Sequence, residues 1–190
     1  MDLIPRAPKE RPGKLMGQPP ATYRQDVARR MVAALRDSGI DFSVVVPDSV
    51  LHGVYSALMR EPTVTSVVCS REDEGIAIAI GAAFAGRSSV VMMEGSGLGY
   101  SSLILARAMV QRSAFLLLVS HNSVLGERFY YHAATRLVAE PTLRALNIPY
   151  HVLVRPDDID VIFREVMNTL RGQRIPVAIL VPRYICVEST

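Results

Sequence analysis

Lysine is almost missing from this chain of 190 residues, and the two that occur, Lys9 and Lys14, both lie in its Pro-rich opening segment. No lysine therefore remains for the folded part. Schiff-base catalysis needs a lysine in the core, and a phosphate-binding P-loop needs one that reaches the phosphates. The sequence argues against both classes of site.

Long apolar runs and a basic stripe are also missing. No stretch of eighteen uninterrupted apolar residues occurs, and the opening segment has no apolar region of the signal-peptide type. We therefore expect a cytoplasmic protein with no membrane partner. The formal net charge is +3, and residues 1–24, with five basic and two acidic side chains, account for all of it. Because the remainder is neutral, we expect no nucleic-acid partner.

Residues that bind metals are few. The two cysteines, Cys69 and Cys186, lie on apolar, strand-like runs, where buried thiols are expected. No Cys/His spacing suggests a zinc site, so we expect no metal bound by this chain alone. Of the histidines, His121 directly follows an apolar run and is either a structural residue or a proton shuttle, while His151 is expected to be structural.

What the sequence does contain is a regular alternation of helix and strand signals from residue 22 onward. Strand-like runs occur at 42–46, 65–69, 89–93, 115–120, 150–154 and 176–181. Several of them are continuously apolar, which is typical of parallel strands that helices cover on both faces. The sequence predicts an α/β fold: a doubly wound, six-stranded, mainly parallel sheet with helices on both faces. Residues 22–190 would form one domain, and residues 1–21 a flexible, Pro-rich basic tail.

Residue types typical of helix ends mark several boundaries. Thr22, with Gln25 three residues later, predicts a capping box at the first helix, and Gly39 stands where that helix should end. Asp157 is the predicted N-cap of the last long helix.

Ligands of parallel α/β sheets bind beyond the carboxyl ends of the strands, so polar residues that follow strands are candidates for a site. Four such junctions are rich in polar groups, at 47–52, 70–75, 94–99 and 120–122. In the first junction, Asp48 or Ser49 can cap the helix that follows.

Three acids, Glu72, Asp73 and Glu74, open a helix that is otherwise small and apolar. Acids in a first turn interact favourably with the helix dipole, which is a purely structural explanation. Apolar surroundings would also raise a carboxyl pKa and suit the group to proton transfer at neutral pH. From the residues alone, both interpretations stay open.

The segment 95–99, Gly-Ser-Gly-Leu-Gly, follows a strand and opens a helix, where free backbone N–H groups can hold an anion or a ring edge. Tyr100 stands where a dinucleotide fingerprint needs its third glycine, which disfavours a Rossmann site. Ser96 could be a hydrolase nucleophile, but Glu94 and Leu98 occupy the glycine positions of that motif. A tight turn is the plainer interpretation.

Together these junctions resemble the pyrimidine-binding domain of thiamine-diphosphate enzymes, and most closely the family of sulfopyruvate decarboxylase alpha subunits and phosphonopyruvate decarboxylases. In that family a glutamate follows the second strand, and the glycine of a Gly-Ala or Gly-Tyr pair comes nine positions later. Glu72 and Gly81 match this spacing. The segments 46–50, 96–99 and 120–121 resemble the first, third and fourth loops of the family.

The resemblance implies roles for these residues. Glu72 would be catalytic and cofactor-binding: it would hydrogen-bond N1′ of the aminopyrimidine and favour the tautomer that deprotonates the thiazolium C2. Gly97, Leu98 and Gly99 would lie against the pyrimidine. His121 would be a second catalytic residue that relays protons.

A further set would face the substrate, a small 2-oxo acid; it consists of Asp48, Ser49, His52, Glu94 and Tyr100. Two of these positions differ from the sulfopyruvate pattern, since Glu94 and Tyr100 replace amides, and the arginine expected after His121 is missing. A sulfonate or phosphonate needs cationic or N–H donors. The differences therefore suggest another 2-oxo acid, or carboligation.

The family's other domain holds Mg²⁺ and the diphosphate with a Gly-Asp-Gly motif, and this chain contains no Gly-Asp-Gly. The resemblance thus implies a diphosphate-binding beta subunit that carries this motif and the Mg²⁺. Thiamine diphosphate would bridge the two chains in an α2β2 or larger assembly. The expected function is the alpha subunit of a heteromeric 2-oxo acid decarboxylase or carboligase. Two alternatives stay open: a catalytically silent regulatory subunit, and a serine hydrolase that uses Ser96.

Overall fold

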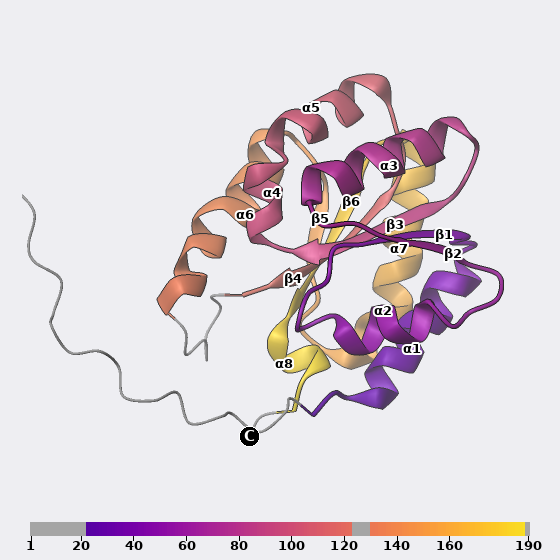
Figure 1. Cartoon of the computed structure of the whole chain (residues 1–190), viewed down its shortest axis with the longest axis vertical. Coiled ribbons are helices and arrows are strands. Elements are labelled where there is room, and N and C mark those ends of the chain that lie inside the picture. The colour runs from indigo at the N-terminus through magenta and orange to yellow at the C-terminus, as the bar shows by residue number, and fades with distance from the viewer. Residues whose placement is uncertain (1–21, 123–129, 189–190) are drawn as a thin grey trace, which may run out of the picture.

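The computed structural model describes residues 22–122 and 130–188, and the predicted tail at 1–21 lies outside them. Its strands form one six-stranded sheet with the order β2-β1-β3-β4-β6-β5 (Figure 1). All pairs of neighbouring strands are parallel. The strands are β1 (Phe42–Val45), β2 (Thr65–Val68), β3 (Ser89–Glu94), β4 (Leu116–His121), β5 (Tyr150–Val152) and β6 (Val177–Pro182). The predicted doubly wound sheet is confirmed, and it is wholly rather than mainly parallel.

Helices cover both faces of the sheet, as predicted (Figure 1). One face carries α1 (Gln25–Asp37), α2 (His52–Leu58), α7 (Ile159–Gln173) and α8 (Arg183–Cys186). The other face carries α3 (Glu72–Phe84), α4 (Ser96–Tyr100), α5 (Ser102–Gln111) and α6 (Ala133–Ala145). Short 3₁₀ helices, η1 (Tyr130–His132) and η2 (Pro156–Asp158), precede α6 and α7.

The central strands are buried along their whole length, because side chains on both of their faces enter one of the two cores. Every residue of β4 and β6 is buried, whereas the edge strand β2 is partly exposed. This burial explains why the central strands are continuously apolar in sequence.

Several predicted helix ends are wrong. No capping box forms at Thr22. Residues 22–24 instead make backbone hydrogen bonds with residues 186–188, and Tyr23 and Val187 form an antiparallel bridge. Asp157 lies inside η2, so α7 begins two residues later. Gly39, by contrast, follows the C-cap of α1 with a φ of +71°, a left-handed conformation that suits glycine.

The predicted helix after β3 is divided into α4 and α5 at Ser101. Both cysteines are buried, as predicted, but Cys186 lies on the short helix α8 and not on a strand. Burial raises the pKa of the Cys186 thiol to about 12, so this group is protonated at neutral pH. Within residues 22–122 and 130–188, no helix is both long enough and apolar enough to cross a membrane.

Candidate active site

The carboxyl edge of the sheet brings together candidate residues from four junctions. Because β2, β1, β3 and β4 are adjacent and parallel, their carboxyl ends lie side by side. Asp48 follows β1, Glu72 follows β2 and starts α3, Glu94 ends β3, and His121 ends β4. A parallel α/β sheet binds its ligands at this edge.

The three acids at the start of α3 have different surroundings. Arg71 donates two hydrogen bonds to Asp73, at 3.1 and 3.0 Å, and this ion pair lowers the pKa of Asp73. Glu74 is exposed to solvent. Glu72 is half-buried and makes no hydrogen bond or ion pair with another described residue. Of the three carboxylates, only that of Glu72 is both sheltered and free to meet a ligand.

Glu72 lies directly against the turn that follows β3. A methyl group built on Gly97 would come within 2.9 Å of both Cβ and Cδ of Glu72, which is too close for two carbon atoms. The missing side chain at Gly97 therefore makes room for the Glu72 side chain. On its other side the turn packs on α6, because a Cβ at Gly99 would lie 2.8 Å from Cβ of Val138.

The remaining residues around this turn differ in orientation. The side chain of Leu98 is fully buried in the core, so only its backbone could face a ligand. The ring of Tyr100 is 57% exposed and packs under the Arg71 guanidinium, 4.9 Å from its centroid. Tyr100 is thus next to the start of α3, and Arg71 is a neighbour that no sequence motif indicates.

Glu94 is engaged with the protein itself. Its Oε2 accepts a hydrogen bond from Ser96 Oγ at 2.7 Å, and its Oε1 accepts bonds from Asn122 Nδ2 and Thr135 Oγ1, both at 3.1 Å. These bonds join β3, α4, α6 and the end of β4. The Ser96 hydroxyl donates its hydrogen to the Glu94 carboxylate, whereas a hydrolase nucleophile is activated by a neighbouring general base such as histidine.

We expect Glu94→Ala to lower the free energy of unfolding by about 1–3 kcal/mol, because three partly buried donors would lose their acceptor. Urea denaturation of the purified chain measures this change. Glu165→Ala, at an exposed position on α7, is the control and should change stability by less than about 0.5 kcal/mol. Equal stabilities of the two variants would contradict a structural role for Glu94.

Asp48 connects the ends of β1 and β4. Its Oδ1 accepts hydrogen bonds from the backbone N–H groups of Val50 and Leu51, at 2.9 and 2.8 Å, and its Oδ2 accepts one from Ser120 Oγ at 3.0 Å. It therefore caps the turn before α2 and not α2 itself. Burial raises the pKa of Asp48 above its ordinary value.

Two further predicted residues lie beside this turn. Ser49 is exposed. His52 is also exposed, and it opens α2, where its Nδ1 lies 2.8 Å from the hydroxyl of Tyr55. Its ring stacks at an angle on Tyr23, with the centroids 5.2 Å apart.

His121 is 3% exposed, and its Nε2 lies 3.3 Å from Glu140 Oε1 on α6. Burial lowers the pKa of His121. Glu140 is not recognisable as a site residue from the sequence, because Glu140 and Arg144 are four residues apart and look like an ordinary ion pair on a helix surface. Only the packing of α6 on β4 shows that Glu140 turns toward a buried histidine.

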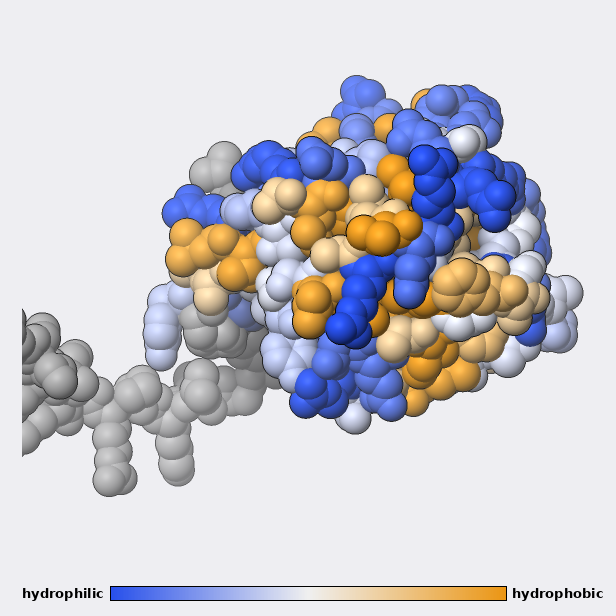
Figure 2. Space-filling view, turned by 90° about the horizontal axis from the view of Figure 1, so that it is seen from above, coloured by the Kyte–Doolittle hydropathy of each residue, from blue (hydrophilic) through white to orange (hydrophobic). Residues whose placement is uncertain are grey.

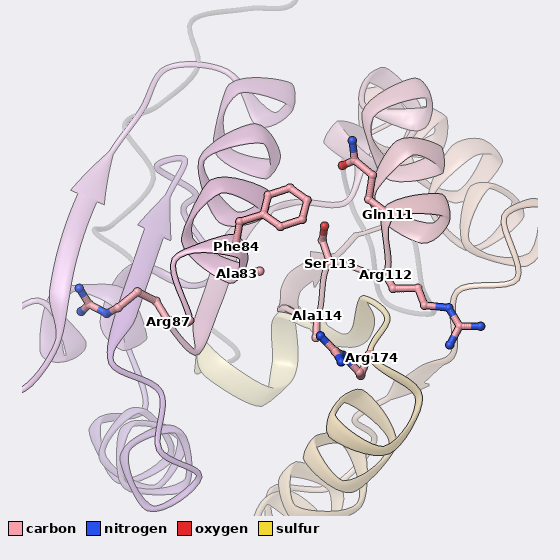
Figure 3. A pocket seen from close by; sticks show the side chains of 9 residues that line it. Ala83, Phe84, Arg87, Gln111, Arg112, Ser113, Ala114 and Arg174 are labelled. Atoms are coloured by element: carbon pink, nitrogen blue, oxygen red, sulfur yellow. The ribbon is translucent and has the colours of Figure 1, made fainter.

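A cavity of about 480 Å³ lies at the opposite edge of the sheet, where β3, β4 and β6 begin (Figure 3). Three arginines line it, but the side chains of Arg87 and Arg112 point away from each other, and Arg87 is bonded to Asp41. This cavity is remote from the carboxyl edge. In the described part of the chain, no three His, Cys, Asp or Glu residues are grouped so that they could hold a metal ion.

Residues 25–137 match the family described as thiamine pyrophosphate enzyme, N-terminal TPP binding domain, and the chain therefore belongs to this family. Its relatives include two proteins named sulfopyruvate decarboxylase subunit alpha. The one from Methanothermobacter thermautotrophicus is 32% identical over 66% of this chain and 76% of its own. The one from Methanococcus maripaludis is 30% identical over 77% of this chain and 89% of its own.

Solved structures share the fold. Benzoylformate decarboxylase from Polynucleobacter necessarius is 18% identical and superposes on 86% of this chain with a TM-score of 0.68. The thiamine diphosphate-dependent 4-hydroxybenzoylformate decarboxylase of Rhodococcus jostii RHA1 is 14% identical and superposes on 85% with a TM-score of 0.64. The match spans 31% of each of those chains, so this chain corresponds to about a third of such a protein.

Proposed function

We propose that this chain is the alpha, pyrimidine-binding subunit of a heteromeric thiamine-diphosphate-dependent 2-oxo acid decarboxylase. The observation that carries the proposal is the free, sheltered Glu72 carboxylate against Gly97, at the ligand-binding edge of a thiamine pyrophosphate enzyme domain. The names of the alpha-subunit relatives support decarboxylation.

The residues around Glu72 suit the pyrimidine end of the cofactor. Glu72 can form a charge-assisted hydrogen bond with a ring nitrogen and hold a proton there. Gly97 and Gly99 leave the turn without side chains, so backbone can approach a flat ring closely. When bound, thiamine diphosphate supplies the electron sink that decarboxylation of a 2-oxo acid requires, and the protein supplies binding and orientation.

The charges beside Glu72 suggest a substrate with few negative groups beyond its carboxylate. Arg71 is the cation beside Glu72 in the described structure, and Asp73 already neutralises it. Glu94 carries a negative charge that could repel an anionic substrate, but its carboxylate accepts hydrogen bonds from three side chains of the protein itself. We therefore infer a 2-oxo acid without a sulfonate or phosphonate. Whether decarboxylation or carboligation follows is decided by product analysis.

The partner, in this proposal, is the diphosphate-binding beta subunit, and it covers the outer face of α3 and α5. Between Glu74 and Arg87 the chain has no charged residue, yet Ala77, Gly81 and Phe84 of α3 are exposed. A helix that is apolar on all sides is normally covered on all sides. Beside it, Leu103 and Val110 of α5 are 66% and 85% exposed.

Figure 2 views this side of the molecule and shows hydrophobic side chains gathered between hydrophilic ones. Exposed apolar patches of this kind mark interaction surfaces. Glu72 opens the same helix α3, so a subunit that covers this face would place its diphosphate site close to Glu72. We assign the Gly-Asp-Gly motif and the Mg²⁺ to that subunit.

Val110→Asp should weaken binding to the beta subunit at least about tenfold, because a charge would be buried in the apolar contact. Val110 lies at the end of α5 away from the carboxyl edge, so a direct effect on the reacting groups is not expected. The dissociation constant is measured by titration calorimetry. Val161→Asp on α7, at an exposed valine of the other face, is the matched control. Equal binding by both variants would place the interface elsewhere.

The function is tested by coexpression with a neighbouring chain that contains Gly-Asp-Gly. The complex is titrated with thiamine diphosphate and Mg²⁺, and CO₂ release is measured with a panel of 2-oxo acids. We expect release only when both chains are present. Equal CO₂ release by the neighbouring chain alone and by the complex would instead favour the regulatory-subunit alternative.

A further inference from the structure

His121, which is buried at the end of β4, lies beside a partly exposed hydrogen-bond network that joins α6 and β5. Its Nε2 lies 3.3 Å from Oε1 of Glu140. The other oxygen of that carboxylate, Oε2, accepts hydrogen bonds from Tyr150 Oη at 2.8 Å and Arg144 Nη1 at 3.2 Å. Arg144 also donates to the Tyr150 hydroxyl at 3.1 Å, so the phenol hydrogen is directed at Glu140. The two oxygens of Glu140 therefore face a guanidinium, a phenol hydroxyl and the imidazole of His121.

This network determines which ring nitrogen of His121 carries the hydrogen. Burial lowers the pKa of His121 more than the Glu140 carboxylate raises it, so the ring is neutral at pH 7. A neutral imidazole has one N–H group, and an ionised carboxylate can only accept a hydrogen bond. The hydrogen therefore lies on Nε2, and Nδ1 presents a lone pair.

That lone pair accepts no hydrogen bond from a described residue. Nδ1 is buried and has no hydrogen-bond partner among the described residues. The next residue, Asn122, repeats the pattern: its amide nitrogen donates to Glu94, and its Oδ1 is buried without a described partner. Buried polar atoms are nearly always hydrogen-bonded. Two open acceptors at the end of β4 therefore point to donors that arrive with a ligand.

We propose that Glu140 is a positioning residue, which holds the hydrogen on Nε2 of His121 so that Nδ1 accepts a hydrogen bond from an O–H or N–H group of the bound substrate. The inference rests on the proposed function, which brings a 2-oxo acid to the same edge of the sheet. The charged and titratable groups of the network are Glu140 and Arg144 on α6 and Tyr150 on β5.

Glu140→Gln tests this assignment, because it keeps the size of the side chain and changes what it can donate. The amide oxygen should turn toward Arg144 and Tyr150, which are both donors, so that the amide NH₂ faces Nε2 of His121. Nε2 must then accept, and the hydrogen moves to Nδ1. Nitrogen NMR of the full chain labelled with ¹⁵N-histidine distinguishes the two tautomers, with His121→Gln used to assign the signal.

In the complex with the beta subunit, we expect Glu140→Gln to lower kcat by about 10²-fold or more, with a smaller change in KM. Glu165→Gln, at an exposed site on α7, should change neither the tautomer nor kcat. Tyr150→Phe removes one donor to Glu140 but leaves the contact between Glu140 and His121, so it should keep the tautomer.

The two readouts separate the possible failures. A Glu140→Gln spectrum that still shows hydrogen on Nε2 overturns the assignment. A switched tautomer with unchanged kcat overturns the role of Nδ1 toward substrate. A wild-type complex that releases no CO₂ from any 2-oxo acid overturns the proposed function and that role with it, although the spectrum still reports whether Glu140 sets the tautomer.

Discussion

Replacing Glu72 with glutamine should lower turnover by about 10²–10⁴-fold, the range that a positioned acid–base group contributes, without changing the fold. Glutamine has nearly the same shape, so the packing of residue 72 on Gly97 is retained. Its amide cannot hold a proton at the pyrimidine ring nitrogen as a carboxyl group does. Since Glu72 bonds to no other described residue, its loss should not destabilise the chain. CO₂ release by the complex with the beta subunit measures the effect.

Glu74→Gln is the matched control, because Glu74 lies in the same helical turn but is exposed. It carries the same helix-dipole interaction as Glu72. If first-turn charge were all that mattered, the two variants would lose activity and stability equally, and that result would contradict the proposed role of Glu72. Titration of cofactor binding in both variants shows whether any loss arises from binding or from the chemical step.

The fold was predictable because each of its main signals is local. Continuous apolar runs marked the buried strands β4 and β6, and their separation by helical patterns required parallel pairing. The helix ends were less predictable. Thr22 is a good N-cap residue, but the bridge between Tyr23 and Val187, which are far apart in sequence, decides the path of the chain there.

The site was predictable as a set of junctions but not as a set of contacts. Order along the chain and the parallel sheet placed Asp48, Glu72, Glu94 and His121 at one edge. The sequence could not show that Glu94 is bonded to Thr135 across 41 positions, or that Glu140 faces His121. Thr135 and Glu140 both lie on α6. The position of that helix on β4 depends on all the residues of the hydrophobic core between the sheet and helices α3 to α6.

Gly97→Ala should also cause a large loss of turnover, about 10²-fold, because it displaces the group next to the reaction rather than removing it. The new methyl group would lie within 2.9 Å of Cβ and Cδ of Glu72, so either Glu72 or the turn at α4 must move. Backbone strain is not the cause, since Gly97 is helical and has no positive φ.

The matched control for that variant is Gly172→Ala on α7, where a methyl group would meet nothing within 4 Å. There, the higher helix propensity of alanine should raise the free energy of unfolding by about 0.5–1 kcal/mol and leave turnover unchanged. Gly97→Ala should instead lower both the free energy of unfolding and turnover. Its loss of stability should be smaller in a Glu72→Ala background, where Cγ and Cδ of residue 72 are absent. Full turnover by Gly97→Ala would mean that the position of Glu72 against this turn is not what the reaction requires.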